Sequence, residues 1–394
     1  MPSHRPSVRG KRYLVSSLHY LSTMAGVRIL ESGGNAADAG VATGICINVL
    51  QPGSAHFGGV APIIYCPASG RPVETISGLG RWPKAASMEY FHKHHSGDMP
   101  TGILRTVTPA APDAWLTALA RFGTMTFEEV VQPGLDLAEN GRPVDTQFHS
   151  LVSDSEIKKW PSTAAVYNPQ GHVPQVGEIF VQKDLANTFK RLIEAERRLS
   201  GDRRTGIQAA RDLIYKGDIA HEIADFHQKE NGFLTYEDLA SFSVRVEPPE
   251  HISYKGYGVY SCGPWCQGPT LLMALKILEG VDLLKMKHNS ADYLHTVIEG
   301  LKLAMADRHA YFGDPDFVQV PMAGLLDERY AAERRQAIDP RHAAPDMPLP
   351  GNPWPYHSEP RGENGPFPRL NPNRNQPSQT SEWETDTSYL CVVD

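Results

Sequence analysis

The stretch DTSYLCVVD, residues 386–394, combines one threonine with a short apolar run. Leu390 to Val393 are all apolar, so they predict a buried β-strand that is bounded by Asp394. A core strand needs neighbours for its backbone groups and its side chains. We therefore expect this strand to pair inside a larger fold, and Thr387 just before it becomes a candidate functional residue.

Length and composition are those of a globular protein. The chain has 394 residues, of which 41% are hydrophobic and 21% charged, enough for one large domain or two ordinary ones. The net charge of −7 argues against nucleic acid or an anionic membrane as the main partner. No run approaches about 18 apolar residues, and the basic N-terminus precedes no apolar signal segment, so we expect a cytoplasmic protein without a transmembrane helix. Five cysteines, an odd number, do not indicate a disulfide framework.

Cap signals predict several helices in the first 250 residues. We expect Thr23 to cap one helix and Asn35 to cap a second helix that is rich in small residues. Thr126 with Glu129, and later Thr235, show the pattern of a helix start.

The rest of the chain shows strand signals, long helices and then a change of composition. Strands are expected at 62–65 and in the hairpin partner at 71–79. Residues 270–312 predict two long amphipathic helices. From 339 to 381 the chain is rich in Pro, Asn, Gly, Arg and Ser, so we assign 338–386 to a flexible segment.

Two clusters look chemical but favour structural interpretations. His92, His94 and His95 lie close together in a polar stretch, without the spaced partners of a zinc site, so we expect solvent-facing side chains. Cys262 and Cys266 are separated by three residues, unlike a thioredoxin-type pair, and two small buried cysteines are the expected arrangement.

Thr387 has a structural and a catalytic interpretation. Threonine is β-branched, and it favours strands for that reason alone. The catalytic interpretation requires cleavage between Asp386 and Thr387. The new α-amino group would then lie beside the hydroxyl and act as its general base, so that one residue supplies both nucleophile and base. A polar segment before Thr387 fits cleavage, because a solvated segment can leave the site afterwards.

Several stretches, in order along the chain, are similar to one enzyme family. The chain resembles the large subunit of gamma-glutamyltranspeptidases, followed by the first residues of their small subunit. The matching stretches are ESGGNAADAGVA (31–42), FGTMTFEEVVQPGLDLAENGRPV (122–144), YKGDIAHEIADFHQKENGFLTYEDLASF (215–242), YKGYGVYSCGP (254–264), ADRHAYFGDPDFVQVP (306–321) and DTSYLCVVD (386–394).

The resemblance implies a fold and a nucleophile. The fold is α+β, a four-layer αββα N-terminal-nucleophile hydrolase sandwich that is incomplete in this chain. Residues 1–386 would correspond to the large subunit, and 387–394 to the start of the small subunit. Thr387 falls on the threonine that the family exposes by self-cleavage, here after Asp386. The family's small subunit supplies the oxyanion-hole glycines, so we expect the 394-residue chain alone to lack a complete active site.

Substrate specificity is where the chain departs from the family. The transpeptidases hold the substrate carboxylate with an arginine in a DGRExxP-like stretch, which corresponds here to SGLGRWP, residues 77–83. Aligned on Pro83, the arginine position holds Leu79. Arg81 lies two residues further on, on the same face of an extended chain, and it is the candidate substitute for substrate binding.

The leading hypothesis is a gamma-glutamyltransferase-like amide hydrolase or acyltransferase that processes itself and works through an acyl-enzyme on Thr387. It would act on a small amide or gamma-glutamyl compound and form a heterodimer with the small subunit, without cofactor, metal, nucleic acid or membrane. The alternatives are an acylase or small-amide hydrolase without gamma-glutamyl specificity, and a non-catalytic truncated remnant.

Overall fold

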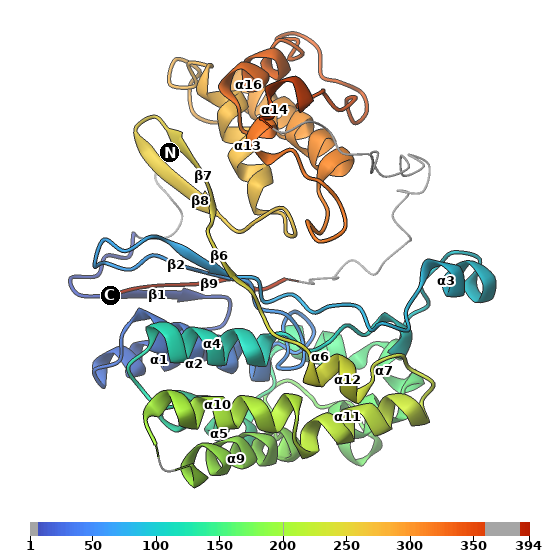
Figure 1. The fold of residues 1–394 in the computed structure, drawn as a ribbon. Helices are drawn as coiled ribbons and strands as arrows, with labels where there is room; N and C mark the ends of the chain where they lie inside the picture. The colour runs from blue at the N-terminus through green and yellow to red at the C-terminus, as the bar shows by residue number, and fades with distance from the viewer. Residues whose placement is uncertain (1–6, 200, 359–386) are drawn as a thin grey trace. The chain divides into compact units, whose positions relative to one another are not determined.

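The computed structural model describes residues 7–199, 201–358 and 387–394, and Figure 1 shows its elements. These residues form two compact units. The first unit comprises 7–63, 78–199, 201–245 and 387–394; the second comprises 64–77 and 246–358. Each unit therefore joins segments that are far apart in the sequence.

The first unit is mostly helical. Its helices are α1 (Tyr20–Glu31), α2 (Ala36–Leu50), α3 (Met88–His95), α4 (Ala111–Phe122), α5 (Phe127–Glu139), α6 (Thr146–Ser153), α7 (Ser155–Lys159), α8 (Pro161–Tyr167), α9 (Lys183–Arg198), α10 (Arg203–Tyr215), α11 (Asp218–Lys229) and α12 (Tyr236–Ala240). Its strands are β1 (Leu14–Ser17), β4 (Arg142–Pro143), β5 (Ile179–Phe180) and β9 (Leu390–Val393).

Helix α2 is the centre of this unit. Almost all of its residues from Ala37 to Leu50 are buried, and it packs against α1, α4, α5 and strand β9. Its small residues allow close approach: a Cβ at Gly44 would collide with the ring of Trp115. Figure 1 shows α1, α2 and α4 beside the β1–β9 strands, with α5, α9 and α10 on the other side of these helices. The unit is thus a small sheet covered by two layers of helices.

Most of the predicted helix starts are confirmed. The Asn35 side chain accepts hydrogen bonds from the backbone N–H groups of Ala37 and Asp38, and Thr126 and Thr235 form capping boxes at α5 and α12. The prediction for Thr23 is wrong, because α1 begins earlier and its N-cap is His19.

The C-terminal strand β9 exists where the sequence predicted it, and it pairs antiparallel with β1. Leu390 lies opposite Ser17, and Val393 lies opposite Leu14. The prediction that this strand is buried is wrong, since the exposed fraction of Val393 is 57%. Among the described residues β1 is the strand partner of β9, and the two strands form a sheet of their own.

The second unit contains three short strands in one sheet, a hairpin and a helical cluster. Its strands are β2 (Ile63–Tyr65), β3 (Glu74–Ile76), β6 (Val246–Glu247), β7 (Glu250–Tyr254) and β8 (Tyr257–Ser261). Its helices are α13 (Gly268–Glu279), α14 (Ala291–Tyr311), α15 (Met322–Leu325) and α16 (Glu328–Arg335). The expected β2–β3 neighbours are confirmed, and α13 and α14 are the two expected long helices.

The segment after α16 differs from the flexible segment predicted for 338–386. Its first part, 338–358, is held by buried groups of the helical cluster. Asp307 accepts a hydrogen bond of 2.8 Å from Gly351 N, and Arg334 donates one of 3.1 Å to Leu349 O. Lys302 likewise donates to Ala344 O at 2.6 Å. The rest of the predicted segment, 359–386, lies outside the described residues.

The described part of the chain is a mixture of helices and short strands, as expected for the α+β class. None of its helices combines the length and apolar character needed to cross a membrane.

Candidate functional site

Thr387 lies at the entrance to β9, in the first unit. Thr387 is exposed, and the backbone that follows it is held by the antiparallel pairing of β9 with β1. The strand thus fixes the direction in which the chain leaves Thr387. Asp386, the other residue of the predicted cleavage site, lies outside the described residues.

A cluster of hydroxyl groups lies at the end of β1 that faces the start of β9. Ser17 is opposite Leu390 in the register, three residues after Thr387. The Ser17 hydroxyl is 2.7 Å from the hydroxyls of both Ser22 and Thr23. Sequence reasoning missed this cluster because it assigned Thr23 to a helix cap. The dense run of hydroxyl residues in SSLHYLST, 16–23, is the signal that could have indicated it.

The loop that contains Leu79 and Arg81 is rigidly connected to its surroundings through backbone groups. Arg81 O accepts a hydrogen bond of 2.9 Å from Thr108 N, and Gly78 O accepts one of 2.8 Å from Ala61 N. Gly78 has φ +54°, and a Cβ there would collide with Ala61 O. The side chain of Leu79 is half-buried, whereas Arg81 is exposed. The assignment of Arg81 to substrate binding stays a prediction.

Behind β9, a buried carboxylate holds the start of α2. Asp38 has no exposed surface, and its oxygens accept hydrogen bonds from the backbone N–H of Asn35, from both the N–H and the hydroxyl of Thr124, and from Met125 N. A buried carboxylate is stable only with such partners. Asp38 therefore has a structural role: it joins α2 to the loop between α4 and α5.

The two apparent chemical clusters behave differently. The three histidines lie on helix α3 and not in a polar loop as the sequence predicted, and the rings of His94 and His95 pack against Tyr90. Cys262 and Cys266 differ from the expectation of two small buried side chains. Both are only partly buried, and the Cys262 thiol hydrogen-bonds to the Cys266 sulfur.

The protein-family model described as gamma-glutamyltranspeptidase matches residues 22–394 of this chain. The chain is 33% identical over 335 residues to the glutathione hydrolase-like YwrD proenzyme of Bacillus subtilis (strain 168), covering 84% of this chain and 61% of that protein. It is also 33% identical over 349 residues to the acylase ACY 1 proenzyme of Pseudomonas sp. (strain SE83), covering 85% and 60%. The chain thus spans about three fifths of the length of these curated relatives.

The chain also resembles solved structures of a gamma-glutamyltranspeptidase and of an acylase. The chain matches the crystal structure of Helicobacter pylori gamma-glutamyltranspeptidase with a TM-score of 0.79 at 28% identity, covering 88% of this chain and 97% of that one. It matches the cephalosporin acylase from Bacillus halodurans with a TM-score of 0.79 at 29% identity, covering 90% and 64%.

The fold is therefore that of the N-terminal-nucleophile hydrolases, which confirms the expected fold class. Within this class, the chain belongs to the gamma-glutamyltranspeptidase family.

Proposed function

We propose that this chain is part of a self-processing amide hydrolase or acyltransferase whose nucleophile is Thr387. The observation that supports this most is the position of Thr387: it is exposed and lies three residues before a strand that the sheet holds in place. A nucleophile at the start of a fixed strand has a defined position, which catalysis requires. Relatives named as glutathione hydrolase and acylase proenzymes support the reaction class and the need for processing.

The proposed chemistry uses Thr387 twice. Its hydroxyl first attacks the carbonyl of Asp386; the peptide C–N bond breaks, the Thr387 nitrogen takes up the proton, and an ester forms. Water then hydrolyses this ester, which leaves Thr387 as a new N-terminus. The freed α-amino group then accepts the hydroxyl proton while the hydroxyl oxygen attacks a substrate amide. The amine of the substrate leaves, and water or another amine releases the acyl group from Thr387. This chemistry needs no cofactor.

Leu79, at the position where the family has an arginine, favours a substrate whose acyl group has no free carboxylate there. A leucine side chain has no hydrogen-bond donor for a carboxylate, and a half-buried site stabilises a charge only when the charge has a partner. Arg81 is exposed nearby in the sequence and would be the substitute donor. An acylase-type substrate is the second candidate, and an acylase relative at 33% identity supports it.

The partner we propose is the segment that follows in the longer relatives. Within the described residues β9 pairs with β1, so its other edge can accept a further strand. After cleavage, large and small segments would form a heterodimer. The cytoplasmic location stays a prediction from the sequence.

The test uses a longer proenzyme, which also contains the region of the curated relatives that this chain does not cover. Purified protein should show a new N-terminus at Thr387 by mass spectrometry, and it should hydrolyse a small amide. Thr387→Ala should abolish both processing and turnover. Thr387→Ser keeps a hydroxyl and should retain both at reduced rates. Amidase activity of an uncleaved chain, or normal activity of Thr387→Ala, would refute the proposal. A processed but inactive protein would refute the catalytic half alone.

A further inference from the structure

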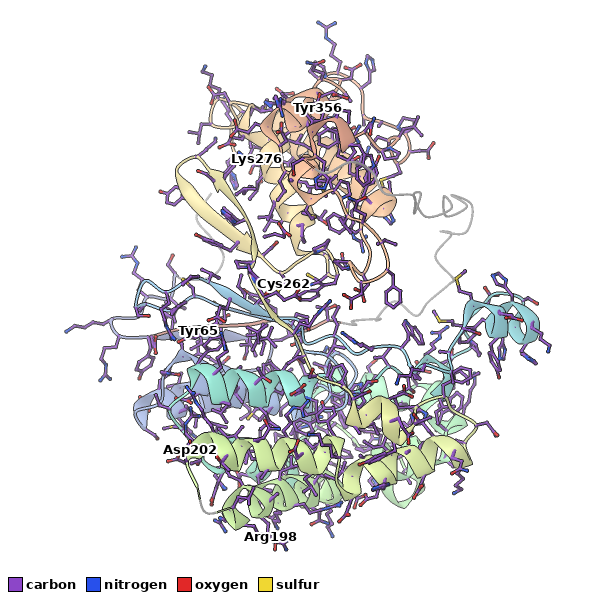
Figure 2. The ribbon with its side chains drawn as sticks, in the orientation of Figure 1. Tyr65, Arg198, Asp202, Cys262, Lys276 and Tyr356 are labelled. Carbon is purple, nitrogen blue, oxygen red and sulfur yellow. The ribbon has the colours of Figure 1, made fainter. Side chains whose placement is uncertain are left out.

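The loop between β8 and α13 contains two cysteines in contact with each other. Cys262 follows the last residue of β8, and one residue, Gln267, separates Cys266 from the start of α13 (Figure 2 labels Cys262 at this connection). A tight turn brings them together, because Cys266 N donates a hydrogen bond of 3.1 Å to Gly263 O. The thiol of Cys262 then donates to the sulfur of Cys266.

The sulfur of Cys266 also occupies the position of a hydrogen-bond acceptor that caps a helix N-terminus. Helix α13 has no side-chain cap at its N-terminus and no acidic residue in its first turn. Its first residue, Gly268, donates its N–H to Cys266 Sγ at 3.4 Å, and Pro269 has no N–H to offer. The N-terminal end of a helix carries a partial positive charge, so it favours a thiolate at Cys266.

The two thiols are therefore not equivalent. The hydrogen bond from Cys262, supported by the N–H of Gly268, lowers the pKa of Cys266 to about 7, although burial opposes this effect. The pKa of Cys262 is raised by the same hydrogen bond and by burial, and the nearby Glu247 carboxylate adds to the increase. Near neutral pH a substantial fraction of Cys266 is therefore thiolate, while Cys262 keeps its proton. Both side chains are partly exposed, so a small reagent can reach them.

We propose that Cys262 and Cys266 form a reversible redox pair that reacts with low-molecular-weight disulfides, with Cys266 as the attacking thiolate and Cys262 as the resolving thiol. This inference does not depend on Thr387 or on the amidase reaction. It identifies a covalent modification site at the start of α13.

The exchange proceeds in two balanced steps. The Cys266 thiolate attacks one sulfur of a small disulfide RSSR, forms a Cys266–S–S–R bond, and releases one thiolate RS⁻. Cys262 then loses its proton and attacks the Cys266 sulfur, which breaks the mixed disulfide and releases the second RS⁻. The protein is oxidised by two electrons and the small disulfide is reduced to two thiols. Excess small thiol reverses both steps. The turn and the hydrogen bond between the two side chains hold the sulfurs near each other, as the second step requires.

The first experiment uses glutathione disulfide as the probe, on the chain with Cys66→Ser and Cys391→Ser, which removes the two exposed cysteines. Cys46 stays, because it is fully buried and burial raises its pKa to about 12. After oxidation, acid quench and alkylation, mass spectrometry should find a Cys262–Cys266 disulfide, the loss of two free thiols, and no retained glutathionyl group. Dithiothreitol should restore both thiols.

Two single variants in this background separate the roles. Cys262→Ser should accumulate one glutathionyl group on Cys266, because the resolving thiol is gone. Cys266→Ser should show at least about tenfold slower modification of Cys262, since the less acidic thiol offers less thiolate. Circular dichroism confirms that each variant is folded. Modification of Cys262 first, or two thiols that react independently without forming the disulfide, would overturn the proposal.

The pH profile of Cys266 alkylation by iodoacetamide provides a second readout that a purely structural pair would not show. The rate should rise with pH with a midpoint near 7, the pKa of Cys266. Cys262→Ala removes the hydrogen-bond donor and should move the midpoint upward, whereas Cys262→Ser keeps a donor and should move it less. A midpoint that is identical in all three proteins would show that Cys262 does not activate Cys266.

Discussion

The side-chain carboxylate of Asp394 accepts a hydrogen bond of 2.7 Å from the backbone N–H of Ala36, which lies 358 residues earlier in the sequence. Ala36 is the first residue of α2, and the next two N–H groups of that helix are bonded to the Asn35 side chain. The end of β9 thus completes the capping of the central helix. The same strand presents Thr387 at its other end, so the helix N-terminus helps to fix the strand that positions the proposed nucleophile.

Asp394→Ala should lower the free energy of unfolding by about 0.5–1 kcal/mol, because a carboxylate at an exposed helix N-terminus is favourable by that amount at low ionic strength. Urea denaturation of the wild type and the variant at low and high salt measures this loss of unfolding free energy, which should be smaller at high salt. Asp346→Ala, at an exposed loop position, serves as the control. Equal effects of the two substitutions would show that the contact with Ala36 has no energetic role.

Asp38→Ala should be much more damaging, on the order of 2–3 kcal/mol, because it removes a fully buried carboxylate and leaves several partly buried N–H groups and one hydroxyl without their acceptor. Thr124→Val removes one hydroxyl of the same network and should cost about 1 kcal/mol. Thermal and urea melts of the two variants and of the double variant give the coupling energy. Additive effects would show that the two groups do not act as one network.

Stability should fall when the pH drops below the ordinary pKa of histidine. Burial lowers the pKa of His227, whose Nδ1 accepts a hydrogen bond from Leu234 N, and burial also lowers that of His19, against the opposing charge of Asp145. The unfolded chain then takes up protons at a higher pH than the folded chain does. The stability that neutral histidines contribute is fully present above about pH 6.5 and is lost as the pH falls toward their folded-state pKa values.

Unfolding free energies at pH 7.5 and pH 5.5 test this, with an expected loss of about 1.4 kcal/mol for each unit of pKa lowering that the interval covers. His227→Gln should reduce the pH dependence. His92→Gln, on the exposed surface of α3, should leave it unchanged. A pH profile that is the same for wild type and His227→Gln would contradict the assignment.

Specificity should respond to Leu79. A buried ion pair contributes on the order of 2–5 kcal/mol when one partner is removed, which corresponds to about 30- to 5,000-fold in binding. We therefore expect weak activity on a gamma-glutamyl anilide in the extended, processed protein, and an increase in Leu79→Arg. Leu79→Met is the control for changes in packing. Arg81→Ala decides whether the neighbouring arginine substitutes. Strong wild-type activity that survives Arg81→Ala would refute this interpretation of the pocket.

The local signals in the sequence predicted local structure well. Asn35, Thr126 and Thr235 begin helices as expected, because the side chain of a cap bonds to backbone only two or three residues away. The strand at Leu390–Val393 was also predicted from its apolar run. Thr23 does not cap a helix as predicted, since its hydroxyl lies against that of Ser17, whose strand approaches it only after the chain has folded back.

The amino-acid sequence by itself determined the family, the fold class, most of the helix starts and the choice of Thr387 as the candidate nucleophile. These depend on residues that are close in sequence or on motifs that follow one another in order. Only the tertiary structure decided which distant groups meet. It paired Asp394 with Ala36, held 338–358 against Asp307 and Arg334, and placed Cys262 in contact with Cys266 at an uncapped helix. Hydrogen-bond geometry changes over tenths of an ångström, and that precision comes from the packing of the whole unit rather than from any local pattern.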